Sequence, residues 1–432
     1  MSRRIFLRNT GLAIAAGAVF PNLVPARAMG RDGGVAPSNR LTMGLVGTGQ
    51  GWSDMQGFLA HKDVQATAIC DVDSNEARRI ARAVDARYRT NGTRAYQDFR
   101  EMFAKEKLDT VIIAPPDHWH AIIAIAAARA GVDIYGEKPL AHTLVEGRAI
   151  ANAVKQHGRV WQTGSWQRSG SAFYRAVSLV RAGVIGRVSH VKVGTLATQN
   201  GFSRSLGTKP DPELIGKPPA HLDYDLWLGP AAHMEYDPRF VKYNWRWILN
   251  FGGGNLMDWV GHHVDIAQWG LDFDETGPAK ITGKAEFSTK LPWDAPTKYE
   301  YECTYANGQV IQVNSGFADG TRFIGEDGRH IYVTRGRLTA SKGVLETKIG
   351  SDAKTTYQSL DHNRNFLDCV KSRRTTITPV ETAHRAASVG HLGQIACLTG
   401  RAIHWDPVTE TIANDPAATA LLSPVYRRPW VL

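Results

Sequence analysis

The 432-residue sequence is poor in cysteine and lacks a long run of basic residues. Its four cysteines show neither C-x-x-C spacing nor a metal-finger pattern, so we expect them to be buried free thiols. Lysine and arginine are mixed with acids along the chain, which gives nucleic-acid binding little support. The apolar run at 11–24 is too short and too rich in alanine and glycine for a comfortable membrane span. The cysteines are Cys70, Cys303, Cys369 and Cys397.

What is present suffices for two folded domains. A chain of this length exceeds one typical domain, and 43% hydrophobic residues provide an ample core. Part of the formal net charge of +10 belongs to residues 1–28, which hold four arginines and no acid.

Residues 1–28 are typical of an export signal. Ser2-Arg3-Arg4-Ile5-Phe6-Leu7 precedes the apolar run, and Ala26-Arg27-Ala28 fits the A-x-A cleavage rule. Twin arginines here favour the Tat export machinery over an ordinary Sec signal or an uncleaved anchor. Because Tat moves folded proteins, a cofactor loaded in the cytoplasm can travel with the protein to the periplasm. Residues 29–40 have the composition of a linker, or of an arm on a neighbouring subunit.

Residues 41–165 follow the pattern of a Rossmann domain with a parallel sheet. The apolar run 41–46 leads into a glycine-rich turn and then a helix-like stretch, the order in which backbone N–H groups receive a pyrophosphate. The match to G-x-G-x-x-G is imperfect, because the third glycine comes one position early. Cofactor contacts are expected from Gly47, Gly49, Gln50, Gly51 and Trp52.

Asp71 ends the second predicted strand, 66–70, about 20 residues past the glycine turn, where an acid can bind the adenosine ribose hydroxyls. A carboxylate at this point repels a 2′-phosphate, so NAD is expected in preference to NADP, which stays possible. The alternative for Asp71 is a cap at the strand end.

Two later loops are expected to meet the cofactor. Predicted strands at 109–114 and 132–135 are each followed by a loop, and ligands of such sheets bind at the carboxyl ends of the strands. The residues expected to contact the cofactor are Pro115, Pro116, His120, Glu137 and Lys138.

The stretch 245–265 concentrates chemistry-bearing residues after three consecutive glycines. Asp258 and His262 are four apart, so an α-helix would place them on one face as a carboxylate–imidazole acid/base pair. The alternative is a buried helix whose polar side chains satisfy each other. A metal site from His262, His263 and Asp265 is less favoured, because adjacent histidines point to different helix faces.

Residues 166–400 are expected to form an α+β domain with an open, mostly antiparallel sheet, followed by a C-terminal tail at 401–432. One expected arrangement packs its last helices back on the Rossmann domain, and the open sheet offers a face for a homo-oligomer. The segment 218–247 is rich in proline and aromatic residues that suit sugar rings, or that pin a long loop over the site. Expected substrate contacts are Gln167, Arg168, Trp245, Arg246 and His263. For Gln167 and Arg168, contact with the nicotinamide or capping of the next helix is the alternative.

The motifs G-E-K-P-L (136–140) and G-G-G-x-x-x-D-x-x-x-H (252–262) together resemble the Gfo/Idh/MocA oxidoreductases over essentially all of residues 41–432. The resemblance implies a nicotinamide cofactor and a carbohydrate or polyol substrate. It also implies that Lys138 is the active-site lysine and that Asp258 and His262 complete the catalytic set. A cationic nicotinamide nearby should lower the proton affinity of Lys138, which can then relay the hydroxyl proton.

Three hypotheses follow. The first is an exported NAD(P)-dependent oxidoreductase acting on a sugar, polyol or glycoside hydroxyl. The second uses the same cofactor for transient oxidation, elimination and re-reduction, which amounts to glycoside cleavage. The third is a non-catalytic carbohydrate-binding Rossmann protein, against which the intact Lys138, Asp258 and His262 count.

The export hypothesis predicts that replacing both Arg3 and Arg4 by lysine leaves precursor in the cytoplasm, because a receptor recognises the arginine pair itself and not charge alone. Fractionation of cells followed by immunoblotting measures this, with the wild-type chain as control. Normal periplasmic accumulation of the double variant would rule out Tat export.

Overall fold

The computed structural model describes residues 35–195, 209, 211–289, 292–350 and 356–432. The expected export signal (1–28) and the first part of the linker (29–34) lie outside the described residues. Residues 1–40 form one unit, whose described part holds the short 3-10 turn η3 (Pro37–Asn39), and residues 41–432 form the other.

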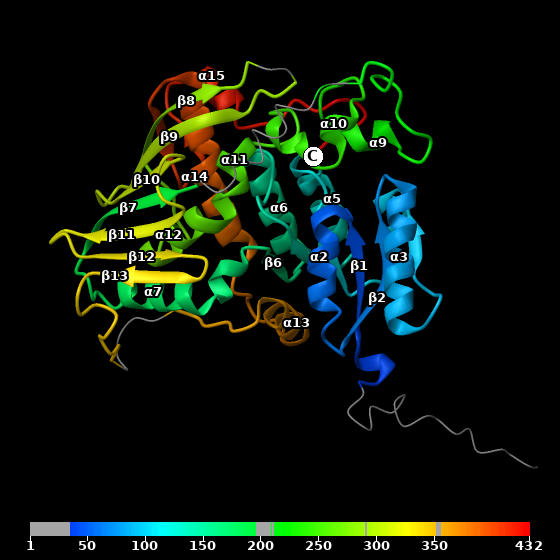
Figure 1. Cartoon of the computed structure of the whole chain (residues 1–432), viewed down its shortest axis with the longest axis horizontal. Helices are drawn as coiled ribbons and strands as arrows, with labels where there is room; N and C mark the ends of the chain where they lie inside the picture. Colours follow the sequence, from blue (N-terminus) through cyan, green and yellow to red (C-terminus); the bar gives the residue numbers. More distant parts are fainter. Residues whose placement is uncertain (1–34, 196–208, 210, 290–291, 351–355) are drawn as a thin grey trace, which may run out of the picture. The chain divides into compact units, whose positions relative to one another are not determined.

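The first sheet of the larger unit is parallel and, among the described residues, has six strands (Figure 1). Its order places β1 and β4 at the centre, and the chain runs away from this pair in both directions, so a crevice opens between their carboxyl ends. In sheet order the strands are β3 (Arg94–Tyr96), β2 (Val64–Cys70), β1 (Leu41–Val46), β4 (Thr110–Ile113), β5 (Asp133–Gly136) and β6 (Trp161–Thr163).

Helices cover both faces of this sheet because its strands are apolar on both sides. Leu45 of β1 belongs to the core under one set of helices, and the next residue, Val46, to the core under the other. The first set is α2 (Gly49–Phe58), α3 (Ser74–Tyr88) and, from far along the chain, α13 (His362–Ser372). The second set is α4 (Phe99–Lys105), α5 (His120–Arg129) and α6 (Leu144–Gln156).

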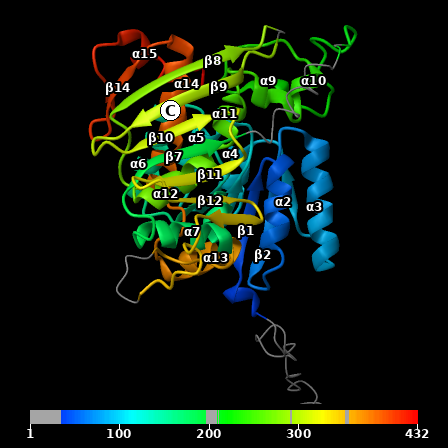
Figure 2. The same cartoon turned by 60° about the vertical axis from the view of Figure 1, so that its left-hand side comes forward.

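The second sheet is mixed and, within the described residues, has nine strands, with β7 and β10 as its parallel pair (Figure 2). Alternation explains its single buried face: Tyr299, Tyr301 and Cys303 of β9 point to the core, while the residues between them are more exposed. In sheet order the strands are β13 (Arg337–Ala340), β12 (His330–Thr334), β11 (Gly320–Gly325), β7 (Val188–Gly194), β10 (Val310–Asn314), β9 (Pro296–Thr304), β8 (Lys280–Phe287), β14 (Ile403–Asp406) and β15 (Thr411–Ile412).

Helices that pack against the second sheet include α7 (Ser171–Arg181), α12 (Asp265–Leu271) and α14 (Val380–Thr399). The last of these also packs against α6, so it joins the two halves of the unit (Figure 1). The expected α/β Rossmann domain followed by an α+β domain with an open, mostly antiparallel sheet is confirmed. Residues 401–432 are more than a tail, because they supply β14, β15 and the short helix α15 (Pro416–Ala420).

Between β7 and β8 the chain forms a long excursion with short helices, and this excursion carries most of the aromatic cluster. Trp227, Phe240, Trp247 and Phe251 are buried together there. The elements are α9 (Tyr224–Leu228), α10 (Pro238–Val241), η7 (Asn244–Trp247), α11 (Gly254–Asp258) and a π-helical segment, η8 (Val260–Val264).

All four cysteines are buried free thiols, as expected. Within the described part of the chain, no helix is both long enough and apolar enough to serve as a membrane span.

Candidate active site

Two adjoining cavities lie at the carboxyl ends of β1, β4 and β5. One, of about 480 Å³, extends from the glycine turn to Asp71; the other, of about 400 Å³, extends to Lys138 and His262. They share the residues Gln50, Ala114, Pro115, Trp245 and Arg246. The two cavities therefore adjoin at this end of the parallel sheet. Together they are called the cleft, the first being the adenosine cavity and the second the inner cavity.

The glycine turn is built for close approach. Gly47 has a φ of +87°, and a Cβ there would lie 2.5 Å from the Pro115 nitrogen. Gly51 lies inside α2, where a Cβ would lie 2.6 Å from Leu45 and 3.0 Å from Ala114. Gly51 therefore gives the close helix–strand contact that the third glycine of the dinucleotide pattern provides. Gly51 performs this packing function of the third glycine, although it stands one position before that glycine in the motif.

Trp52 is the exception among the residues of the turn. Its side chain packs against the core between α2 and the sheet instead of lining either cavity. Once Gly51 faces the sheet, the next position is rotated by a helical step of about 100° away from the cleft. The expectation of a cofactor contact through the Trp52 side chain is therefore not met.

Asp71 lies at the adenosine end of the cleft and also braces the turn. Its Oδ2 accepts hydrogen bonds from the Thr48 backbone N–H (2.8 Å) and hydroxyl (2.6 Å), and its Oδ1 accepts one from the Asp73 N–H (2.9 Å). Burial raises its pKa, although these hydrogen bonds oppose the shift. Each carboxylate oxygen can accept about two hydrogen bonds, so Oδ1 retains capacity for a ribose hydroxyl. Bracing and ribose binding are thus compatible.

A cover of chain lies over the adenosine end. His221 O accepts from the Ser74 N–H (2.9 Å), the Asp223 N–H donates to Val72 O (3.0 Å), and Leu222 forms an isolated bridge with Asp73. The same excursion contributes Trp227, Tyr236, Tyr243 and other residues to the cavity lining. Its aromatic cluster fixes this cover in place.

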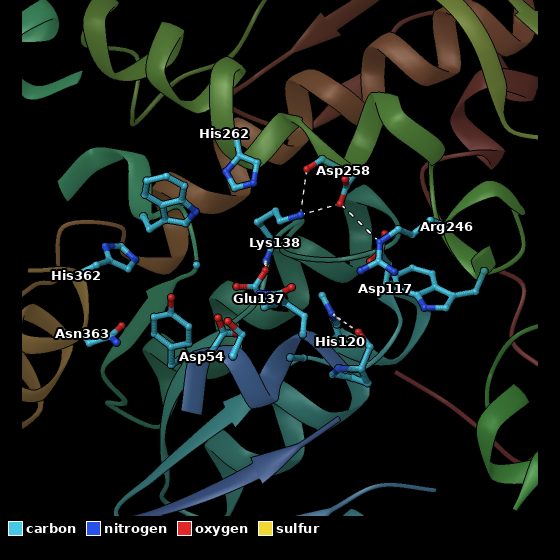
Figure 3. A pocket seen from close by; sticks show the side chains of 18 of the residues that line it. Asp54, Asp117, His120, Glu137, Lys138, Arg246, Asp258, His262, His362 and Asn363 are labelled. Carbon is cyan, nitrogen blue, oxygen red and sulfur yellow. Dashed lines mark hydrogen bonds and ion pairs between the residues drawn. The ribbon is translucent and has the colours of Figure 1, made fainter. Parts of the chain in front are cut away.

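Lys138 extends from the end of β5 into the second cavity and pairs with Asp258 at the end of α11 (Figure 3). The Lys138 Nζ lies 2.7 Å from Asp258 Oδ1 and donates to the Asp258 carbonyl at 3.2 Å. Gly261 makes room for this side chain, because a Cβ there would lie 2.6 Å from Lys138 Cβ. Arg246 Nε is 3.9 Å from the same Asp258 oxygen.

The ion pair decides the charge of both partners. Burial alone disfavours each charged form, but Asp258 and Glu137 outweigh it and raise the pKa of Lys138. Burial likewise works against the Asp258 carboxylate, and Lys138 and Arg246 lower its pKa in spite of it. Lys138 is therefore an ammonium in its pair with Asp258. The effect of a cationic nicotinamide on its proton affinity stays a prediction.

His262 lines the same cavity but does not pair with Asp258 (Figure 3). The expected pairing assumed α-helical spacing, whereas 260–264 are π-helical, and a π turn of about 4.4 residues shifts the phase of position i+4. Burial and the nearby charges of Lys138 and Arg335 hold the pKa of His262 well below its ordinary value. Its Nδ1 is buried and has no hydrogen-bond partner among the described residues. His262 is thus a neutral imidazole with an unused nitrogen.

Three buried carboxyl groups also line this cavity. Burial raises the pKa of Asp54 to about 7 and that of Asp117 and Glu137 to about 8. The sequence predicts Glu137 as part of the site but does not predict Asp54 or Asp117. Their signal is positional: Asp54 follows Gln50 by one helical turn in α2, and Asp117 follows the two prolines after β4. Asp54 Oδ2 is buried and has no partner among the described residues.

The loops after β4 and β5 are tied together by His120. One ring nitrogen lies 2.8 Å from Pro139 O and the other 3.0 Å from Pro115 O, and burial lowers the pKa of His120 to about 4. A neutral imidazole donates to one of these carbonyls only. His120 lines the inner cavity, and Pro116 lines the adenosine cavity. The sequence predicts both residues as cofactor contacts.

Two of the expected substrate contacts lie at the junction of the two cavities. Trp245 and Arg246 line both, and the Arg246 guanidinium stacks on the rings of Trp245 (4.3 Å) and Tyr243 (4.5 Å). Three other side chains line the inner cavity from distant parts of the chain, without a local sequence signal: Arg335, His362 and Asn363.

The other expected substrate contacts are buried away from the cleft, so these three predictions are wrong. Arg168 pairs with Asp265 (2.7 Å) and Asp274 (2.8 Å) and is 1% exposed. His263 is fully buried, with its Nε2 3.3 Å from Asp319, and the Gln167 amide lies 3.3 Å from its Nδ1. A buried guanidinium must be paired with carboxylates to offset the loss of its hydration, and Asp265 and Asp274 are the partners of Arg168. The same pairings separate Asp265 and His263 from His262.

The residues present fit a dinucleotide. The cleft has a glycine-rich turn at the pyrophosphate position, an acid at the ribose position and an orphaned carboxyl oxygen on Asp54 near the lysine. A Rossmann cleft of this kind, ending in a lysine–carboxylate pair and a neutral histidine, is that of a nicotinamide-dependent oxidoreductase.

Sequence comparison agrees with this class. The family model described as the oxidoreductase family's NAD-binding Rossmann fold matches residues 41–165, and the model of its C-terminal alpha/beta domain matches residues 174–432. The chain belongs to the Gfo/Idh/MocA oxidoreductase family.

Curated relatives include a glycosyl hydrolase family 109 protein of Parabacteroides distasonis, 29% identical over 260 residues, which are 54% of this chain and 51% of the relative. Another, from Shewanella putrefaciens, is 26% identical over 204 residues, 44% of each chain. The chain thus spans about half the length of these relatives.

Solved structures share the fold. The WlbA dehydrogenase of Bordetella pertussis, solved with NADH and UDP-GlcNAcA, has a TM-score of 0.61 at 16% identity, covering 85% of this chain and 99% of its own. The scyllo-inositol dehydrogenase of Lactobacillus casei, solved with NAD(H) and scyllo-inositol, has a TM-score of 0.57 at 14% identity, covering 84% and 98%.

The position of Asp71 predicts cofactor preference. The change Asp71→Asn keeps an acceptor for Thr48 but removes the charge that repels a 2′-phosphate, so it should weaken NAD and narrow its advantage over NADP. Titration of cofactor-depleted protein with both dinucleotides measures this, and Glu76→Gln, a neutralised acid in the same cavity lining, is the control. Tighter binding of NADP than NAD by the wild-type protein would contradict the assignment.

Proposed function

We propose that this protein transfers a hydride between a sugar, polyol or glycoside hydroxyl carbon and a tightly bound NAD. One observation carries the proposal: Lys138, Asp258 and His262 line a cavity that adjoins the dinucleotide cleft. A bound nicotinamide would supply the hydride acceptor. The cover formed by residues 219–246 supports tight retention of the cofactor, since it closes the adenosine end of the cleft.

The proton of the substrate hydroxyl is assigned to His262. Lys138 is a fixed ammonium, so it donates a hydrogen bond to the substrate oxygen and stabilises the negative charge that grows there. His262 is neutral and lines the cavity, so a ring nitrogen can accept the proton as the hydroxyl is oxidised and return it in the reverse direction. Asp258 holds Lys138 in position and keeps it charged.

The wall of the cavity suits a sugar ring. Trp166 and Trp245 line it, and aromatic faces pack against the apolar face of a pyranose while the polar groups bond its hydroxyls. Trp166 is 43% exposed, an unusual position for a tryptophan outside a binding site.

Net glycoside cleavage through transient oxidation is the second candidate. Two observations favour it: the curated relatives named as glycosyl hydrolase family 109 proteins, and the carboxyl of Asp117, whose pKa of about 8 keeps it protonated at neutral pH. A protonated carboxyl in the cavity can supply the proton that a departing aglycone needs.

The experiment that separates the candidates is product analysis with purified holoprotein. A panel of sugars, polyols and aryl glycosides is incubated with it under single-turnover conditions. Oxidoreduction gives a keto product and one reduced cofactor per molecule of substrate, whereas cleavage gives a free sugar and aglycone with no net change in the cofactor. A protein that binds these compounds without either outcome would support the non-catalytic alternative.

Turnover should depend on the cluster of Lys138, Asp258 and His262. His262→Ala and Lys138→Ala should each lower kcat by about 10²- to 10⁴-fold with the cofactor still bound, the usual range for acid/base groups. Asp258→Asn combined with Lys138→Ala should cost little more than Lys138→Ala alone, because residues that act as a unit are not additive.

The control for these variants is His190→Ala, which removes an exposed histidine outside both cavities. Melting temperature is measured on the same samples. A destabilised His262→Ala variant that keeps normal turnover would show that the histidine is structural.

Periplasmic location and self-association are further parts of the proposal. The twin-arginine segment supports export with the cofactor already bound. The outward face of the nine-stranded sheet carries cross-strand pairs, Lys284 with Glu300 (2.8 Å) and Lys298 with Glu286 (3.0 Å), and supports association with a second copy. A monomeric mass in light scattering at all concentrations would contradict association.

A further inference from the structure

Arg335 reaches the inner cavity from the other half of the molecule. It lies in the turn between β12 and β13 of the nine-stranded sheet, and its side chain lines the same cavity as Lys138 and His262. No motif marks it in the sequence, and the proton chemistry assigned to the cluster does not use it.

Two indole rings, and not carboxylates, hold this guanidinium. Arg335 Cζ lies 4.8 Å from the ring centroid of Trp166 and 4.8 Å from that of Trp259. Trp259 is itself fixed, since it is buried and stacks on His263 with ring centroids 4.8 Å apart. Each such cation–π contact contributes about 0.5–1 kcal/mol at exposed sites and more when water is excluded. The position of Arg335 is therefore defined before any ligand binds.

The in-plane N–H groups of Arg335 are available. Among the described residues it makes no hydrogen bond and no ion pair, and the carboxylates that act on it from a distance, Asp319 and Asp258, are engaged by His263 and Lys138. Stacking uses the faces of a guanidinium and leaves its edge free, and that edge matches both oxygens of a carboxylate. The other cavity arginine, Arg246, already has Asp258 and Tyr243 O as partners.

The charge of the cavity points the same way. Lys138 and Arg246 both face the carboxylate of Asp258, and their charges keep it ionised. Burial keeps the carboxyls of Asp117 and Glu137 largely protonated at neutral pH. The lining therefore holds three cations, Lys138, Arg246 and Arg335, against the ionised Asp258 and a partly ionised Asp54, so its net charge is positive.

We propose that the substrate is a sugar carrying a carboxylate, a uronic acid or uronide, whose carboxylate binds the edge of Arg335 while a ring hydroxyl lies between Lys138 and His262. This inference rests on the proposed function, because it names the substrate class of the same site. Arg335 then fixes specificity and takes no part in the proton transfer.

The test compares methyl β-glucuronide with methyl β-glucoside, which differ only in the carboxylate. Binding to purified holoprotein is measured by calorimetry, and reduction of the bound cofactor by absorbance. The wild-type protein should bind the glucuronide at least about 10-fold more tightly. Arg335→Ala should remove about 10- to 100-fold of glucuronide affinity, the usual worth of hydrogen bonds between charged groups, and change glucoside affinity little.

Two further variants make the result specific. Arg337→Ala removes the same charge from the same hairpin, at a position that does not line the cavity, and should leave the preference intact. Arg335→Lys keeps the charge but not the planar edge, and should recover only part of the affinity. The melting temperature of each variant checks that it is folded.

The inference fails if the two glycosides bind equally, if neither binds, or if Arg335→Ala loses both to the same degree. Preference for a sulfated sugar over the glucuronide would also overturn it. If the glucuronide binds through Arg335 but never reduces the cofactor, the proposed oxidoreduction fails while the carboxylate subsite stands. If neutral sugars reduce the cofactor equally well, the subsite fails while the oxidoreduction stands.

Discussion

The ion pair between Lys138 and Asp258 is the interaction on which the rest of the site depends. It joins the end of β5 in the Rossmann half to the end of α11 in the other half, over 120 residues of sequence. Gly261 permits it sterically, and the pair keeps Lys138 an ammonium. Burial, together with the charge of Lys138, keeps His262 neutral by lowering its pKa. Loss of one partner would leave a buried charge, which is costly in a site of this kind.

The excursion between β7 and β8 adds a second constraint. Its short helices have little stability of their own, because the cost of forming the first helical turn is not recovered over so few residues. A cluster of buried aromatic residues gives them a fixed position, and backbone hydrogen bonds to 72–74 attach them to the Rossmann half. The same segment thus covers the adenosine end of the cleft and brings Trp245 and Arg246 to its junction with the inner cavity.

The order of the Rossmann elements could be predicted from the sequence, because glycine turns and apolar strands are local signals. Three features could not. The π-helical segment at 260–264 places His262 on a different side of the helix from Asp258, and residue propensities do not predict such a segment. Arg168 follows the last strand of the sheet, as a ligand-binding residue would, but its partners Asp265 and Asp274 are 97 and 106 residues away in the sequence. Arg335 reaches the cavity only because the second sheet folds against the first half.

The most direct test of this account is a crystal structure of the holoprotein with a sugar bound in the inner cavity. The account predicts one ring hydroxyl within hydrogen-bond distance of both the Lys138 Nζ and a ring nitrogen of His262, with Lys138 still paired to Asp258. A sugar whose hydroxyls contact neither Lys138 nor His262, or a holoprotein in which the Lys138–Asp258 pair is broken, would contradict it.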